Sequence, residues 1–288
     1  MRQMIPSFVF KGRAWAAIKP WLQALVVIGL LAMLPGLINE VTGLLLSDDM
    51  AEAISGPLAT EEEFLLAVKN FFLDKGWIML LVAVLELLLT PALMMPLYGS
   101  LMDSQRKKEV TFGGAMKYLR LSPKALLLEI WIMIRVQVWM LPGMAAMILG
   151  IFIPGIGEAL IWVGFLASMV LGIRAGLHYG LASIVFADDT ALSPNACVRI
   201  SWEIMRRRKM ELFCLNLSFI GWDLLISFAS MMIMGIFGTV IGNTVSMMAS
   251  LLLSIYVSAA QVCFFLAYSG KLSHEAQAAD HGEDDPLN

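Results

Sequence analysis

Long apolar runs separated by polar segments dominate the chain. Each run has about the 20 residues that an α-helix needs to cross the hydrocarbon core of a bilayer. The pattern predicts an all-α fold, a polytopic membrane bundle of six transmembrane helices. We expect the spans at residues 21–41, 77–98, 125–149, 159–185, 212–234 and 245–268. Residues 1–270 then form a single membrane domain, and residues 271–288 are expected to be a disordered acidic tail.

A shorter amphipathic segment precedes the first, third and fifth spans. In the last of these, Ser193 and Pro194 suit the cap and first turn of a helix, which places Val198, Trp202 and Met205 on one face. Such a helix lies along the membrane surface. Spans two and four both end in Tyr-Gly, and spans one and three both contain Leu-Pro-Gly. We therefore expect three copies of a unit made of a cytoplasmic interfacial helix and a transmembrane hairpin.

The placement of charge predicts the orientation. Of the 288 residues, 59% are hydrophobic and 15% are charged, a balance that excludes a soluble domain. Most of the 20 lysines and arginines precede span one, follow span two or follow span four, whereas the loop 47–76 is acidic. The positive-inside rule places both termini in the cytoplasm and the acidic loop outside.

The outer acidic loop, residues 47–76, has a helical pattern of its own. Thr60 and Glu63 have capping-box spacing, and Phe64, Val68 and Phe71 follow at helical intervals. A short surface helix leading into span two is expected. It either rests on the lipid headgroups or presents its acidic start to a cation or a basic partner.

Charged residues inside the spans need a physical reason, because each costs about 2.5 to 3.5 kcal/mol to insert. The candidate mid-membrane polar site consists of Glu86, Arg135, Arg174, His178 and Asp223. Glu86 with Arg135, and Asp223 with Arg174, are examples of structural ion pairs that would fix the bundle. The alternative is that these groups bind a substrate, an ion or a lipid headgroup.

Spans five and six carry polar stripes, and in span six the polar residues recur every three or four positions on one face. The stripes contain Asn216, Ser227, Ser230, Asn243, Ser246, Ser250, Ser254, Ser258 and Gln261. Small hydroxyl side chains allow close helix packing. A hydrophilic pathway between the two spans is the alternative. In span four, small residues every four positions from Gly164 to Gly180 predict close packing as well.

A basic segment leads into span five and contains Arg199, Arg206, Arg207, Arg208 and Lys209. Such cations set the topology and attract anionic lipids of the inner leaflet, at about 1 kcal/mol each. A docking surface for a cytoplasmic protein is the other interpretation. The expected partners are the bilayer, anionic inner-leaflet lipids and a membrane or cytoplasmic protein, with no nucleic acid.

The stretch SWEIMRRRKMELFCLNLSFIGW, Ser201 to Trp222, resembles an uncharacterised bacterial six-helix membrane family, domain of unknown function 975. The resemblance implies a protein of the bacterial cytoplasmic membrane and no particular activity. Family members usually have a glycine where this chain has Arg208, which leaves a tight turn and a continuous helix as alternatives before span five. The chain also distantly resembles the membrane domain of some glycerophosphodiester phosphodiesterases, which implies a lipid-related role.

No catalytic signature is present: the chain lacks HExxH, GxSxG and the phosphate-binding GxxxxGK[ST] pattern. The three cysteines have no metal-binding spacing. We therefore expect no enzyme activity, cofactor or metal. Two functions remain: a non-catalytic membrane scaffold or accessory subunit that binds a partner or lipid, and a small transporter or lipid-handling protein that uses the mid-membrane charges and the polar stripes.

Overall fold

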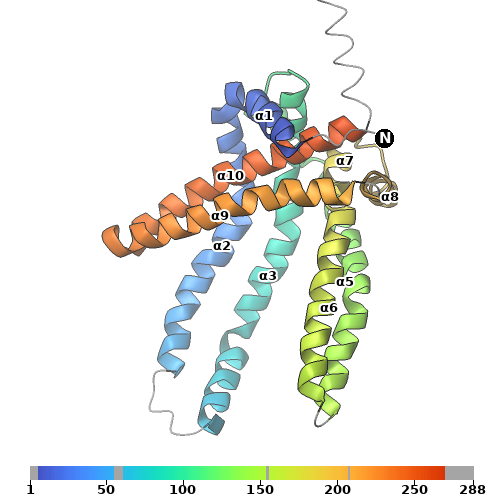
Figure 1. Ribbon diagram of the computed structural model, residues 1–288. Helices are drawn as coiled ribbons and strands as arrows, with labels where there is room; N and C mark the ends of the chain where they lie inside the picture. The colour runs from blue at the N-terminus through green and yellow to red at the C-terminus, as the bar shows by residue number, and fades with distance from the viewer. Residues whose placement is uncertain (1–5, 55–60, 154–155, 207, 270–288) are drawn as a thin grey trace, which may run out of the picture.

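The computed structural model describes residues 6–54, 61–153, 156–206 and 208–269, which are helical throughout apart from short turns and contain no strand (Figure 1). Six of their helices are long and apolar enough to cross a membrane. These are α2 (Leu22–Ile54), α3 (Glu61–Gln105), α5 (Ser122–Phe152), α6 (Gly157–Tyr179), α9 (Lys209–Phe237) and α10 (Thr239–Tyr268). The shorter elements are α1 (Ser7–Ile18), the 3-10 turn η1 (Lys19–Trp21), α4 (Phe112–Leu119), α7 (Ala182–Asp188) and α8 (Pro194–Met205). The prediction of an all-α protein with six candidate membrane helices is confirmed.

Two helix boundaries differ from the predicted spans. Helix α3 is continuous over 45 residues, so the surface helix expected before span two is the first part of that span's own helix. At 1.5 Å per residue it is about 67 Å long, roughly twice the thickness of the hydrocarbon core. Much of the expected outer loop 47–76 is therefore helical, while its residues 55–60 and the tail 271–288 lie outside the described residues. Helix α6 ends at Tyr179 instead of continuing to residue 185, and α7 follows as a separate helix.

Buried side chains concentrate at one end of the molecule, where the short helices α1, α4, α7 and α8 pack against the long helices (Figure 1). We call this end the hub. Its fully buried side chains include Ile18, Leu97, Leu101, Phe186 and Phe264. In a membrane such side chains stabilise the bundle chiefly through close van der Waals packing between helices. The hub therefore holds the ends of the long helices together.

Helices α5 and α6 form a hairpin in which the two backbones approach closely. A Cβ atom at Gly164 would lie 2.7 Å from the carbonyl oxygen of Gly143. Gly157 would meet the carbonyl oxygen of Gly150 in the same way, and Ser168 faces Gly143. The predicted packing role of the small residues in span four is observed for Gly164 and Ser168. Gly176, in contrast, has open space where its Cβ would be.

The third hairpin, α9 and α10, runs across α2 and α3 near the hub instead of alongside them (Figure 1). Helix α1 holds this hairpin in place from the hub side. Its Phe10 ring packs against Phe264 at a centroid distance of 5.4 Å. The Nζ atom of Lys11 donates to the carbonyl oxygen of Ser218 at 3.1 Å and lies 4.3 Å from the centroid of the Phe219 ring.

The order of elements contains a short helix followed by two long helices three times: α1 with α2 and α3, α4 with α5 and α6, and α8 with α9 and α10. Helix α7 stands outside this pattern. The order agrees with the expected repeat but does not test whether the three units share a common origin or a common orientation in the membrane. The threefold repeat and the interfacial position of the short helices therefore stay predictions.

Candidate functional site

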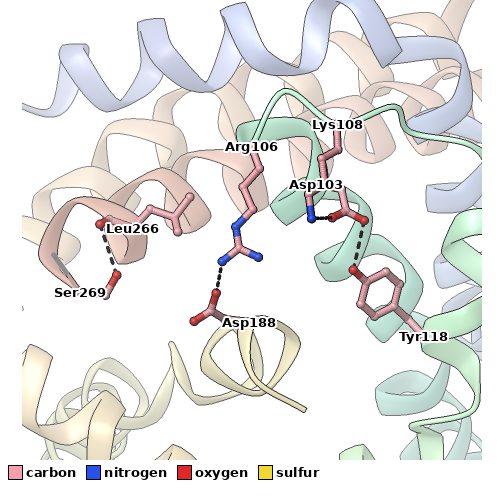
Figure 2. A network of polar contacts seen from close by, with 7 residues as sticks. All are labelled: Asp103, Arg106, Lys108, Tyr118, Asp188, Leu266 and Ser269. Atoms are coloured by element: carbon pink, nitrogen blue, oxygen red, sulfur yellow. Dashed lines mark hydrogen bonds and ion pairs between the residues drawn. The ribbon is translucent and has the colours of Figure 1, made fainter. Parts of the chain in front are cut away.

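Polar contacts between distant segments gather in the hub. Figure 2 shows Arg106, which directly follows α3, in an ion pair with Asp188 of α7. The Asp188 side chain is 4% exposed and that of Arg106 is 24% exposed. Tyr118 of α4 donates a hydrogen bond to Asp103 Oδ2 at 3.1 Å. Burial, with the negative charge of Asp103, raises the pKa of Tyr118 to about 12, so its hydroxyl remains a donor at neutral pH.

The cations of the basic segment before α9 lie in different environments. The guanidinium of Arg208 pairs with Glu211, which also accepts a hydrogen bond from the Tyr268 hydroxyl. The Arg208 side chain is only 15% exposed, and its hydrogen bond to Glu211 raises its pKa. The expected lipid contact of Arg208 is therefore corrected: its charge is used inside the protein to join α9 to α10.

The other members of the segment are more accessible. Arg206 is exposed, and its guanidinium carbon lies 5.7 Å from the centroid of the Trp202 ring. Arg199 is 75% exposed, with Nε 4.0 Å from a Glu203 oxygen. Lys209 is partly exposed at the start of α9. Arg207 lies outside the described residues. Because α8 ends at Met205 and α9 begins at Lys209, a short break separates the two helices, and the alternative of a continuous helix before span five is excluded.

The expected mid-membrane charges do not pair with one another. Among the described residues, no ion pair joins Glu86 to Arg135 or Asp223 to Arg174. Arg135 donates to Asn195 Oδ1 at 3.4 Å. The guanidinium carbon of Arg174 lies 5.8 Å from the Trp139 ring centroid. The described side chains therefore do not show the suggested pairings.

His178 is buried at the end of α6, and it serves the packing of α8. Its ring stacks on Trp202 at a centroid distance of 5.9 Å. The buried hydroxyl of Ser201 donates to the His178 backbone carbonyl at 2.8 Å. These contacts attach α8 to α6 and fix the position of Trp202.

A basic cavity of about 740 Å³ lies between α5 and α8. Its polar and aromatic lining includes Arg135, Tyr179, Asn195, Arg199 and Trp202. No carboxylate is among its described lining residues. The cavity therefore brings together Arg135, expected in the mid-membrane site, and Arg199, expected at the lipid surface.

The polar stripes of α9 and α10 line a second cavity, of about 330 Å³. Asp223 and Asn216 face it from α9, and Gln261 donates to Asn216 Oδ1 at 3.2 Å across the two helices. The serines that line it on the α10 side are Ser250, Ser254 and Ser258. The two stripes are thus brought together, with room left between them.

Two members of the α9 stripe bond within their own helix. The Ser227 hydroxyl donates to the Asp223 carbonyl at 2.9 Å, and the Ser230 hydroxyl donates to the Ile226 carbonyl at 2.7 Å. Neither hydroxyl is described in a hydrogen bond across to α10. The hydroxyl donors of these serines are therefore satisfied within α9, and their small side chains occupy little space on the helix surface.

Glu86 lines two cavities, one on each side of α3. One has about 430 Å³ and includes Glu40, Asn243, Ser246 and Ser250. The other has about 500 Å³ and includes Glu129, whose carboxylate accepts a hydrogen bond from Ser183 at 3.5 Å. No lysine or arginine is among the described residues that line either cavity. Acidic and basic groups are therefore separated between cavities.

Several residues of these sites were not singled out from the sequence. Asn195 and Tyr179 line the basic cavity, Glu40 lines an acidic one, and Asp188 anchors the hub. Their positions depend on contacts between distant segments. Only the Arg208 and Glu211 pair had a local signal, since a spacing of three residues on a helix allows an ion pair.

Comparison of the chain with family models, curated proteins and solved structures finds no match. The fold defines the class, a multi-pass helical membrane protein. The resemblance of Ser201 to Trp222 to domain of unknown function 975 stays a prediction.

Proposed function

We propose that this chain is a non-catalytic membrane scaffold that gathers anionic phospholipid, and with it a membrane or cytoplasmic protein, around its hub. The single observation that carries this proposal is the uneven distribution of the core. A cluster of buried side chains joins the described helices at one end, and one ion pair, Arg106 with Asp188, adds to it, while the outer parts of the hairpins expose large apolar side chains. A rigid basic end with apolar arms suits attachment to lipid.

The orientation of the scaffold follows from its charges. The hub carries exposed cations such as Lys117, Arg199 and Arg206, and cations favour the cytoplasmic, anionic face of a membrane. We infer that α1, α4 and α8 lie at this face as interfacial helices of a threefold repeat. Both termini are then cytoplasmic, and the membrane is the bacterial inner membrane that the resemblance implies.

The proposal is tested by extracting the protein into polymer discs with its native lipid and comparing the disc lipid with the bulk membrane. We expect enrichment of anionic phospholipid. A vesicle assay of lipid movement between leaflets runs beside it, and the purified protein should leave that rate unchanged. Disc lipid identical to the bulk membrane would count against the scaffold.

A second candidate function is a small transporter or lipid-handling protein. It is favoured by the cavity between α9 and α10, because Asp223, Asn216 and Gln261 line a space that packing alone does not require. In this case the vesicle assay shows solute or lipid movement, and Asp223→Ala abolishes it without loss of folding. A fully active Asp223→Ala protein excludes this use of the cavity.

A further inference from the structure

The basic cavity contains two guanidinium groups that lack strong partners. Arg135 has five N–H donors, and its described hydrogen bond is to a neutral acceptor, Asn195, at 3.4 Å. The Trp131 ring lies 5.3 Å from its guanidinium carbon. Arg199 is 4.0 Å from Glu203, at the limit of an ion pair, and 75% exposed. The cavity therefore presents positive charge and free donors.

The cavity lies beside the C-terminal end of α6, where α8 docks against α5. Trp139 Nε1 donates to the hydroxyl of Tyr179, the last residue of α6, at 3.2 Å. Arg135 is one turn closer to the start of α5, about 6 Å further along the axis. It is therefore close to the last turns of α6, although α5 itself begins 13 residues earlier, at Ser122. The expectation that Arg135 lies at mid-membrane depth stays a prediction.

The surroundings of the cavity have the composition of a membrane interface. Arg174 lies over Trp139 and Arg206 lies over Trp202. Tryptophan and arginine side chains gather where hydrocarbon meets the headgroups. Val138, three residues from Arg135 and so on a neighbouring part of the same helix face, is 57% exposed. A polar cavity thus borders an apolar helix surface that an acyl chain can cover.

We propose that the basic cavity binds the phosphate group of an anionic phospholipid. The ligand chemistry is a phosphate ester, held by the guanidinium groups of Arg135 and Arg199, since arginine matches phosphate with paired hydrogen bonds. Ser193 accepts a hydrogen bond from the Ala196 backbone, which leaves its own hydroxyl hydrogen for the ligand. This inference rests on the proposed scaffold function and names its lipid site.

The test compares two double variants of the full chain in discs of defined lipid. R135Q/R199Q removes both cavity cations, and R120Q/K124Q removes two exposed hub cations outside the cavity. Native mass spectrometry measures the retention of phosphatidylglycerol against phosphatidylcholine. We expect R135Q/R199Q to bind phosphatidylglycerol about tenfold or more weakly, and R120Q/K124Q to bind it nearly as well as the unmodified protein.

Equal loss in both double variants, or no loss in R135Q/R199Q, overturns the site. If discs of R135Q/R199Q made from native membrane are still enriched in anionic lipid, the proposed scaffold function is retained, but the basic cavity is not its lipid site. If R135Q/R199Q does not fold, by circular dichroism and size exclusion, R199Q alone replaces it because that side chain is largely exposed.

Two soluble probes separate the sources of phosphate. Inorganic phosphate and glycerol 3-phosphate are titrated against the protein in phosphatidylcholine discs, with thermal stabilisation as the readout. We expect no stabilisation at millimolar concentration, because a lipid is also held by its acyl chains. Stabilisation by either probe without a preference for phosphatidylglycerol assigns the cavity to a soluble phosphate and overturns the lipid source.

Discussion

The close contact between α5 and α6 predicts that a single methyl group added at Gly143 destabilises the protein. In Gly143→Ala, the new methyl group would lie 2.6 Å from the Ser168 backbone nitrogen and 2.7 Å from the Gly164 carbonyl oxygen. Ordinary contact begins at 3.4 Å. Because both obstacles are backbone atoms, no side-chain rotation relieves the clash. The two helices must separate.

The expected cost follows from overpacking, which typically destabilises a protein by about 1 to 3 kcal/mol. Gly176→Ala is the matched control, because its methyl group meets nothing within 4 Å. In a helix, alanine is favoured over glycine by about 1 kcal/mol. The free energy of unfolding of the control should therefore be unchanged or slightly higher. That of Gly143→Ala should be lower than the control's by roughly 1 kcal/mol or more.

The assay is equilibrium unfolding in mixed micelles, followed by far-ultraviolet circular dichroism and by tryptophan fluorescence. Trp139 and Trp162 lie on the two helices of the hairpin and report on its separation. Equal stability of Gly143→Ala and Gly176→Ala would refute the close approach of the two backbones.

Three further predictions concern the hub. Asp188→Asn leaves the charge of Arg106 without its partner and should destabilise the protein by on the order of 3 kcal/mol; an unchanged thermal midpoint in detergent would contradict this. Arg208→Ala should lower that midpoint more than Arg206→Ala, because only Arg208 is buried in an ion pair; equal shifts would argue against the internal role. Tyr118 has its pKa raised from 10.0 to about 12, so stability should fall between those pH values as the unfolded state loses the proton first. Tyr118→Phe should reduce this fall, and an identical pH profile would exclude Tyr118 as its source.

The six long helices could be predicted from the sequence because apolar length is a local property. The ends of the helices were harder to predict from the sequence. The start of α3 lies in an acidic segment that is helical by its own pattern, and nothing between Glu61 and Trp77 stops the helix. At the other end, α6 stops at Tyr179 inside an apolar run that continues to Phe186, so hydropathy does not mark the break.

The candidate site could be predicted only in its parts. The sequence identified Arg135 as a charge inside a span and Arg199 as part of the basic segment before span five, but nothing in it brought the two together. Their common cavity depends on where α8 docks, which is set by the stacking of His178 on Trp202 and by the hydrogen bond of Ser201. Such contacts between distant segments have no local pattern. The polar stripes of α9 and α10 were easier to predict, because helical spacing alone puts their members on one face.

The central claim, that the hub holds anionic phospholipid at the basic cavity, is tested most directly by photo-crosslinking. A phosphatidylglycerol analogue with a photoreactive group near the phosphate is activated in discs, and the labelled peptides are mapped by mass spectrometry. The account predicts labels concentrated on residues 131–139 of α5 and 193–202 of α8, and lost in R135Q/R199Q. Labels spread evenly over the exposed cations of the hub, or unchanged in that variant, would contradict it.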